Sequence, residues 1–145
     1  AATPDKPNRY GLTQGAVNAI EPGKRMASSM SPTIVLKAGK PFLALGTRGG
    51  PAIPTTVLQV LLNVIVYGKS LSDAIAAPRY HHQAYPDEIQ YERGRASSAT
   101  INGLNAIGHG VRVRDGIGDV HALGFGAGKN TAVECPRACG AAGGY

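Results

Sequence analysis

Residues 33–50 read TIVLKAGKPFLALGTRGG, and this stretch decides the fold. Two apolar runs, 33–36 and 41–45, flank a short turn that contains Gly39, which is the pattern of a β-hairpin. Both runs are apolar at nearly every position, so we expect a sheet that is covered on both of its faces. The glycine-rich residues 46–51 then predict a sharp turn at the end of the second strand.

Beyond this turn, the apolar residues from about Pro54 to Tyr67 cover most of a helix circumference, which predicts a mostly buried helix. Ser70, with Asp73 three residues later, predicts the cap that begins a short second helix. We expect a strand at 88–92, a short helix at 97–107 and two last strands at 111–114 and 120–125. The order β-β-α-α-β-α-β-β predicts an α+β fold built in layers.

Composition excludes several classes of protein. Hydrophobic residues make up 43% of the 145 residues and charged residues 17%, which is typical of a globular domain or a piece of one. The net charge of +6 is scattered along the chain without a basic run, so we expect no nucleic-acid partner. No apolar run approaches the ~18 residues that a membrane span needs. The chain begins at Ala1 and not at Met, which indicates a cut end.

The residues 124–130, GFGAGKN, are similar to a phosphate-binding loop. Leu123 stands where the first glycine of such a loop should be, and Asn130 replaces the Ser or Thr that would hold magnesium. We therefore interpret this segment as a hairpin or loop.

The sequence offers weak candidates for metal ligation. His81 and His82 are adjacent, so on a strand they point to opposite faces, and no third ligand lies near them. We interpret them as structural imidazoles and expect no metal site. Cys135 and Cys139 allow either one local disulfide or two free thiols.

Two short segments are candidates for a binding or catalytic site. Ser28 and Ser29 come shortly before a buried strand, and Gly49 and Gly50 follow the next one. Consecutive glycines let neighbouring N–H groups converge on one point, which is what an oxyanion hole requires. Either segment alone is equally typical of an ordinary turn or cap.

Taken together, these segments resemble one family. Residues 24–35, KRMASSMSPTIV, resemble the KRPLSSMSPTIV segment of the γ-glutamyltranspeptidases, and the spacing to 46–50 matches that family's GSPGG loop. Residues 77–83, APRYHHQ, match its APRFHHQ segment, and residues 59–63, 86–89 and 144–145 also agree. The chain is identified as similar to the C-terminal portion of the small subunit of this family.

The resemblance implies a fold and a mechanism. Members are N-terminal-nucleophile hydrolases with a four-layer αββα sandwich, and they need no cofactor. A precursor cleaves itself, and the new N-terminal Thr attacks a glutathione-like donor with its own α-amine as the general base. The γ-glutamyl group then passes to water or to an amine or peptide acceptor. By this resemblance, Ser28 and Ser29 bind the donor's α-carboxylate, and Gly49 and Gly50 supply the oxyanion-hole N–H groups.

The resemblance also implies what this chain lacks. The nucleophilic Thr is absent from it, so we expect residues 1–145 to be a single partial domain that is inactive alone. Within it, residues 1–31 form an extended lead-in that carries the serine pair, and residues 32–145 form the layers of sheet and helix. The expected partners are the large subunit, the Thr-led upstream segment of the same precursor and a γ-glutamyl small molecule. A periplasmic or secreted location is expected from the family alone.

The sequence departs from the family pattern in two places. Arg48 replaces the usual Pro of the glycine loop, and residues 134–137, ECPR, only partly follow the family's SDPR stretch. Two alternatives stay open beside a γ-glutamyl enzyme. One is a cephalosporin-type acylase of the same fold, and the other is a non-catalytic structural fragment.

Overall fold

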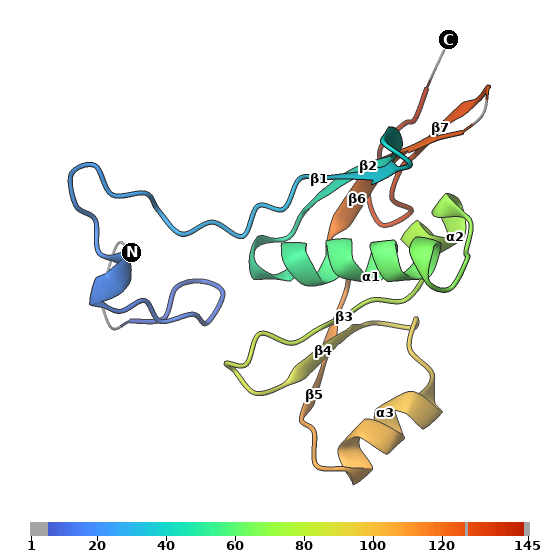
Figure 1. Ribbon diagram of the computed structural model, residues 1–145. Helices are drawn as coiled ribbons and strands as arrows, with labels where there is room; N and C mark the ends of the chain where they lie inside the picture. The colour runs from blue at the N-terminus through green and yellow to red at the C-terminus, as the bar shows by residue number, and fades with distance from the viewer. Residues whose placement is uncertain (1–5, 127, 144–145) are drawn as a thin grey trace.

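The computed structural model describes residues 6–126 and 128–143, so the agreement with the family at residues 144–145 lies outside the described residues (Figure 1). The helices are η1 (Ala16–Asn18), η2 (Gly50–Ala52), α1 (Ile53–Ile65), α2 (Leu71–Ala76) and α3 (Ser98–Ala106). The strands are β1 (Thr33–Lys37), β2 (Lys40–Arg48), β3 (Tyr80–His81), β4 (Ile89–Glu92), β5 (Val111–Arg114), β6 (Asp119–Phe125) and β7 (Asn130–Val133).

Four strands form the main sheet, in the order β1-β2-β6-β7, with every neighbouring pair antiparallel. The predicted hairpin is confirmed as β1 and β2, in which Thr33 faces Leu45. The predicted start of the turn at residue 46 is wrong. Strand β2 continues to Arg48 because its last residues pair with β6, where Arg48 faces Asp119, and the chain turns only at Gly49.

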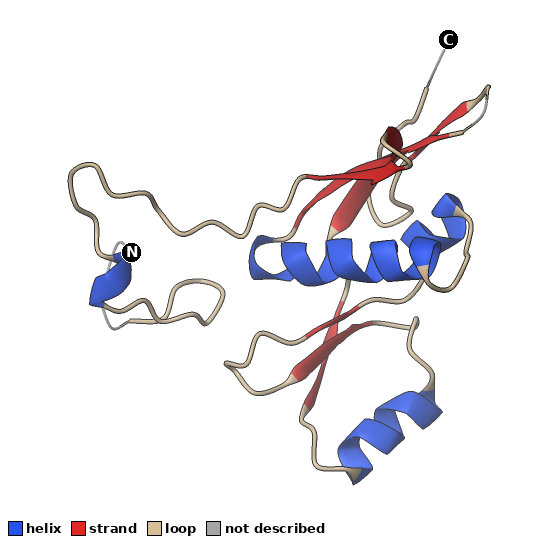
Figure 2. Ribbon diagram, in the orientation of Figure 1, coloured by secondary structure: helices blue, strands red, loops and turns tan. Residues whose placement is uncertain are grey.

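A smaller sheet has the order β3-β4-β5 and lies on the other side of α1 from the main sheet (Figure 2). Strand β3 is antiparallel to β4, whereas β4 and β5 are parallel. The side chain of Gln59 on α1 holds β3 in place, because its amide donates to the Tyr80 carbonyl at 2.7 Å and its carbonyl accepts from the Tyr80 N–H at 3.0 Å. The sequence predicted β4 and β5 but neither β3 nor β7.

The hydrophobic core lies between the main sheet and helices α1 and α2. Its buried members come from the inner face of the sheet, from the two helices and from the segment after β7: Leu43, Leu45, Val57, Val60, Ala74, Ile75, Val120, Ala122 and Cys135. The predicted cap of the second helix is confirmed, since the Ser70 hydroxyl accepts the Asp73 N–H at 3.1 Å.

The outer face of the main sheet is not covered by any described residue of this chain, so within residues 6–126 and 128–143 the expected cover is found on one face only. Ile34 is 71% exposed, Leu36 60% and Leu123 46%. The reason is that the helices of this chain pack on one side of the sheet only (Figure 1). An apolar sheet face of this kind needs another layer against it.

Helix α1 is likewise buried on one side only, although the sequence predicted a mostly buried helix. Ile53, Thr56, Val57 and Val60 are buried, whereas Leu58, Leu62 and Ile65 are exposed at helical spacing. In the part of the chain that the structure describes, no helix has the length and apolar character to cross a membrane.

Candidate active site

The turn between β2 and α1 contains the predicted glycine pair in an unusual backbone conformation. Gly49 has a φ of 148° and Gly50 a φ of 58°, both in the region that favours glycine. Gly50 begins η2, which runs directly into α1, and the first N–H groups of a helix have no acceptor within the helix. The helix dipole adds positive potential at this end. The turn can therefore present N–H groups to a negative oxygen.

Strand β6 and the residues before it support this turn. A β-carbon added to Gly49 would lie 3.6 Å from the Cα of Gly118, so the two backbones pack closely. The Asp119 N–H donates to the Thr47 hydroxyl at 2.7 Å. The Arg48 side chain, at the position where the family pattern has Pro, is 78% exposed and forms a 3.0 Å ion pair with Asp119. Arg48 thus points to solvent beside the turn.

Tyr10 covers Gly50, a contact that the sequence analysis missed. A β-carbon on Gly50 would lie only 2.7 Å from the Tyr10 ring. Hydrogen bonds tie Tyr10 to α1: the Gln83 amide donates to the Tyr10 carbonyl at 2.9 Å, and His81 bridges Gln83 at 2.9 Å and Thr55 at 2.8 Å. The only sequence signal for this connection was the APRYHHQ segment, which contains His81 and Gln83.

A cavity of about 230 Å³ opens beside the turn. It is lined by Arg9, Tyr10, Gly11, Gly49, Pro51, Ala52, His81, Gln83, Pro86, Gln90, Arg112 and Arg114. Three of these described lining residues carry guanidinium groups and none carries a carboxylate. Arg112 is paired with the Glu88 carboxylate at 3.1 Å, so the charges of Arg9 and Arg114 are the ones in this lining that favour a ligand with negative charge.

The serine pair lies toward the same end of the main sheet. Thr33 pairs with Leu45, so the residues that precede Thr33 approach the end of β2 that leads to Gly49. Ser28 is exposed and accepts the Met30 N–H at 3.2 Å, and Ser29 is half-buried. Among the described residues, no hydrogen bond joins the serine pair to the glycine pair. The chain enters β1 from the serine pair and leaves β2 to the glycine pair at the same end of the sheet.

The histidines have structural contacts. His81 is buried and His82 is exposed, so they point to opposite sides as predicted, and His82 bonds Asp87 at 2.9 Å. Within residues 6–126 and 128–143, no group of three or more His, Cys, Asp or Glu side chains could hold a metal ion.

Two further sequence alternatives are decided by the structure. Cys135 and Cys139 are both free, the first buried and the second exposed. Phe125 pairs with Asn130 across β6 and β7, so the segment similar to a phosphate-binding loop is a hairpin as predicted.

Comparison with solved structures defines the class: the fold is α+β, of the N-terminal-nucleophile hydrolase type. The chain superposes on a γ-glutamyltranspeptidase of Helicobacter pylori with a TM-score of 0.88 and 43% identity, covering 94% of this chain and 75% of the other. For the enzyme of Pseudomonas nitroreducens the TM-score is 0.91 at 37% identity, covering 99% and 76%. Residues 1–145 match the family described as gamma-glutamyltranspeptidase, and the chain belongs to this family.

A curated relative shows how much of a complete protein this chain represents. It is 46% identical over 126 residues to the glutathione hydrolase proenzyme of Escherichia coli K12. The match covers 87% of this chain but 22% of the relative, so the chain spans about a fifth of that protein's length.

Proposed function

We propose that this chain is part of a γ-glutamyltransferase or glutathione hydrolase, in which Gly49 and Gly50 form the oxyanion hole. The observation that carries the proposal is the Gly49–Gly50 turn, with its φ values of 148° and 58° at the start of a helix. Membership of the γ-glutamyltranspeptidase family supports it.

In the proposed reaction, a Thr at the new N-terminus of the small subunit attacks the γ-carbonyl carbon of the donor. Its hydroxyl proton passes to its own α-amine, and the carbonyl oxygen becomes an oxyanion that accepts the N–H groups of Gly49 and Gly50. The intermediate collapses to an ester as the amine leaves with the transferred proton. Water or an acceptor amine then attacks this ester, takes the γ-glutamyl group and releases the Thr hydroxyl. Loss of one oxyanion donor typically costs ~3–4 kcal/mol.

The polar groups near the turn fit such a donor. Ser28 and Ser29 offer hydroxyl donors for the α-carboxylate of the glutamyl group. The arginine-lined cavity beside Gly49 has room for further negative charge, and glutathione-like donors carry a second carboxylate. These features favour a γ-glutamyl donor over the acyl groups that a cephalosporin-type acylase would remove.

The exposed apolar surfaces support the proposed partners. The open sheet face, with Ile34, Leu36 and Leu123, fits the second sheet of an αββα sandwich, which the Thr-led upstream segment would supply. The exposed row on α1, with Leu58 and Ile65, is a surface that the large subunit can cover. The named relative is a proenzyme, as self-cleavage of a precursor requires.

The test uses the complete precursor that contains this chain, allowed to mature. It should release the anilide from a γ-glutamyl anilide, and an added dipeptide should accelerate the release by accepting the γ-glutamyl group. A precursor that matures but releases no anilide would contradict the proposal.

A further inference from the structure

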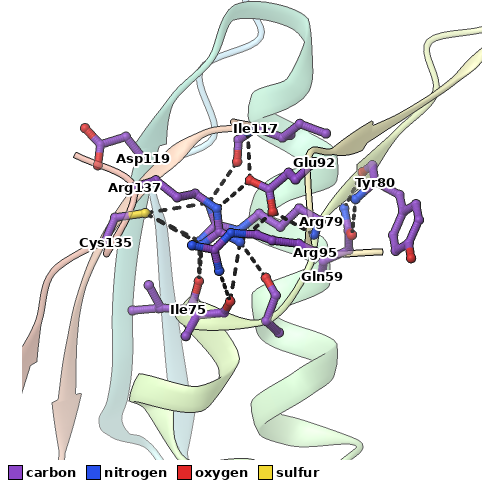
Figure 3. Close-up of polar contacts among 12 residues, drawn as sticks. Gln59, Ile75, Arg79, Tyr80, Glu92, Arg95, Ile117, Asp119, Cys135 and Arg137 are labelled. Carbon is purple, nitrogen blue, oxygen red and sulfur yellow. Dashed lines mark hydrogen bonds and ion pairs between the residues drawn. The ribbon is translucent and has the colours of Figure 1, made fainter. Parts of the chain in front are cut away.

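Four side chains from distant parts of the sequence meet in a buried cluster between the two sheets (Figure 3). Arg79 precedes β3, Glu92 ends β4, and Cys135 and Arg137 follow β7. Arg79 is 1% exposed, Glu92 1% and Cys135 2%, and the Arg137 side chain is 5% exposed. Charges buried this deeply are strongly destabilising unless they are paired.

Glu92 and Arg137 form one pair. The Arg137 guanidinium contacts the Glu92 carboxylate through two of its nitrogens, Nε and Nη2, and the Nη2 contact is 2.6 Å long. The same carboxylate accepts the backbone N–H groups of Ile117 at 2.9 Å and Arg79 at 3.1 Å. Burial alone would raise the pKa of Glu92, but these hydrogen bonds and the Arg137 charge lower it. The carboxylate balances one guanidinium and has its oxygens occupied.

Arg79 is the second guanidinium of the cluster. Its Nη1 donates to the Ile117 carbonyl at 2.8 Å and its Nη2 to the Ile75 carbonyl at 2.7 Å. Among the described residues, no carboxylate forms an ion pair with Arg79. Both of its terminal nitrogens lie 3.8 Å from the Cys135 sulfur, and Nη1 of Arg137 lies 3.9 Å from it. The sulfur thus contacts two guanidiniums, and without it the cluster has one excess positive charge.

The surroundings of the sulfur favour its ionised form. Burial alone would raise the pKa of Cys135, but the backbone N–H groups of Arg137 and Val120 and the charge of Arg79 lower it below the ordinary 9.0. Among the described residues, the charged side chains that contact the sulfur are Arg79 and Arg137, and Arg137 is also the ion-pair partner of Glu92. In the resemblance described above, Cys135 stands at the Asp of SDPR, so a thiolate would keep a negative charge there.

The buried cluster is connected to the Gly49–Gly50 turn through residues 117–118. The Arg79 guanidinium donates to the Ile117 carbonyl and the Glu92 carboxylate accepts the Ile117 N–H, so the two peptide groups that flank the Ile117 Cα are both held. The next residue, Gly118, is the one against which Gly49 packs. Movement of Arg79 would therefore shift the support of the turn.

We propose that Cys135 is a thiolate in the folded protein and acts, through Arg79 and residues 117–118, as a positioning residue for the Gly49–Gly50 turn. The positioning role rests on the proposed function, whereas the ionisation state does not. Displacement of catalytic groups by about 1 Å can cost ~100-fold in rate, so a looser turn should be visible in kcat.

The first experiment measures ionisation in the complete, matured protein. Thiolates absorb at about 240 nm, and the difference between the Cys139→Ser protein and the Cys135→Ser/Cys139→Ser protein isolates the Cys135 contribution. We expect this absorbance to be present at neutral pH and to disappear on acidification while the circular dichroism stays native. Absorbance that develops only near the ordinary pKa of 9.0 would overturn the proposal.

The second experiment tests positioning. Cys135→Ser should lower kcat for a γ-glutamyl anilide roughly tenfold or more with a smaller change in KM, and Cys135→Asp should retain most of kcat because it restores the charge. The exposed Cys139→Ser is the matched control and should behave as the parent. A fully active Cys135→Ser protein would overturn the positioning role.

The two experiments separate the possible failures. If Cys135→Ser does not fold, the absorbance titration can use the Cys139→Ser protein alone, followed from acid to alkaline pH, together with the kcat of Cys135→Asp. A protein without γ-glutamyl activity would refute the proposed function but still give a thiolate titration. An active protein whose Cys135 titrates normally would refute this inference alone.

Discussion

The Tyr10 ring lies over Gly50 so closely that a β-carbon on Gly50 would come within 2.7 Å of it. Gly50 also has a φ of 58°, which strains any residue with a side chain. Two independent constraints therefore require glycine at the residue proposed to donate to the oxyanion.

Gly50→Ala should lower kcat for a γ-glutamyl anilide about 10²–10³-fold, because a moved N–H group removes one oxyanion donor. Steady-state kinetics of the matured protein measure this change. The control is Gly103→Ala in α3, where an added β-carbon has open space and activity should be unchanged. Full activity of Gly50→Ala would remove this residue from the oxyanion hole.

Ser28→Ala combined with Ser29→Ala should raise KM for the donor by roughly 100-fold or more, since each of the two hydrogen bonds to a charged group contributes about 1.5–3 kcal/mol. The effect on kcat should be smaller. Ser98→Ala, at the exposed start of α3, serves as the control. If the double variant has the parental KM, the serines do not bind the donor.

Glu92→Gln should destabilise the protein by about 3–5 kcal/mol, because it leaves Arg137 buried without its partner. The fall in the thermal unfolding midpoint measures it. Glu88→Gln is the control: Glu88 pairs with the 63%-exposed Arg112, and a pair with an exposed partner contributes about 0–1 kcal/mol. Equal effects of the two substitutions would contradict a special role for the buried pair.

The contribution of Glu92 to the stability of the protein depends on pH in a defined direction. Its folded pKa lies below the ordinary 4.5, so its contribution to stability is complete above about that pH and is lost as the pH falls through the folded pKa. The stability difference between the parent and Glu92→Gln should therefore shrink below pH 4.5. A difference that stays constant through this range would show that ionisation of Glu92 does not stabilise the fold.

Ser70→Ala should lower the free energy of unfolding by about 1 kcal/mol, because it removes the helix cap of α2. In the parent, the Ser70 hydroxyl accepts the Asp73 N–H. Thermal unfolding measures this cost. Ser72→Ala, exposed on the same helix, is the control and should be neutral or slightly stabilising, because Ala is the better helix former. A neutral Ser70→Ala would show that the cap does not contribute.

Local signals predicted much of the fold. The apolar runs around Gly39 define the β1–β2 hairpin, and the Ser70 hydroxyl places the start of α2. Strands β3 and β7 were missed because they are short and exist by pairing with distant strands. The parallel pairing of β4 with β5 is also a tertiary contact, with a helix between the two strands in sequence.

The burial pattern of β4 shows why the buried cluster could not be predicted from the sequence. Gln90 and Glu92 are buried, whereas Ile89 and Tyr91 are only half-buried, so the polar face of this strand points inward. Hydropathy alone predicts the opposite. The partner of Glu92 is also remote: Arg137 lies 45 residues away in sequence, and the two side chains meet only in the folded chain.

Only part of the candidate site could be predicted from the sequence. The glycine pair and the serine pair were selected as candidates because their residue types match a known pattern, and their roles stay predictions. Tyr10 was missed because it lies 40 residues before Gly50 and carries no motif of its own. Its contact with Gly50 depends on the hydrogen bonds through Gln83 and His81.

The measurement that tests the central claim most directly is intact-mass spectrometry of the matured protein, mixed with a γ-glutamyl donor and quenched in acid. The account predicts that the subunit containing this chain gains one γ-glutamyl group, carried as an ester on its N-terminal Thr. It further predicts that Gly50→Ala strongly slows the formation of this adduct. Donor turnover with no adduct on that Thr, or with the adduct on another residue, would contradict the account.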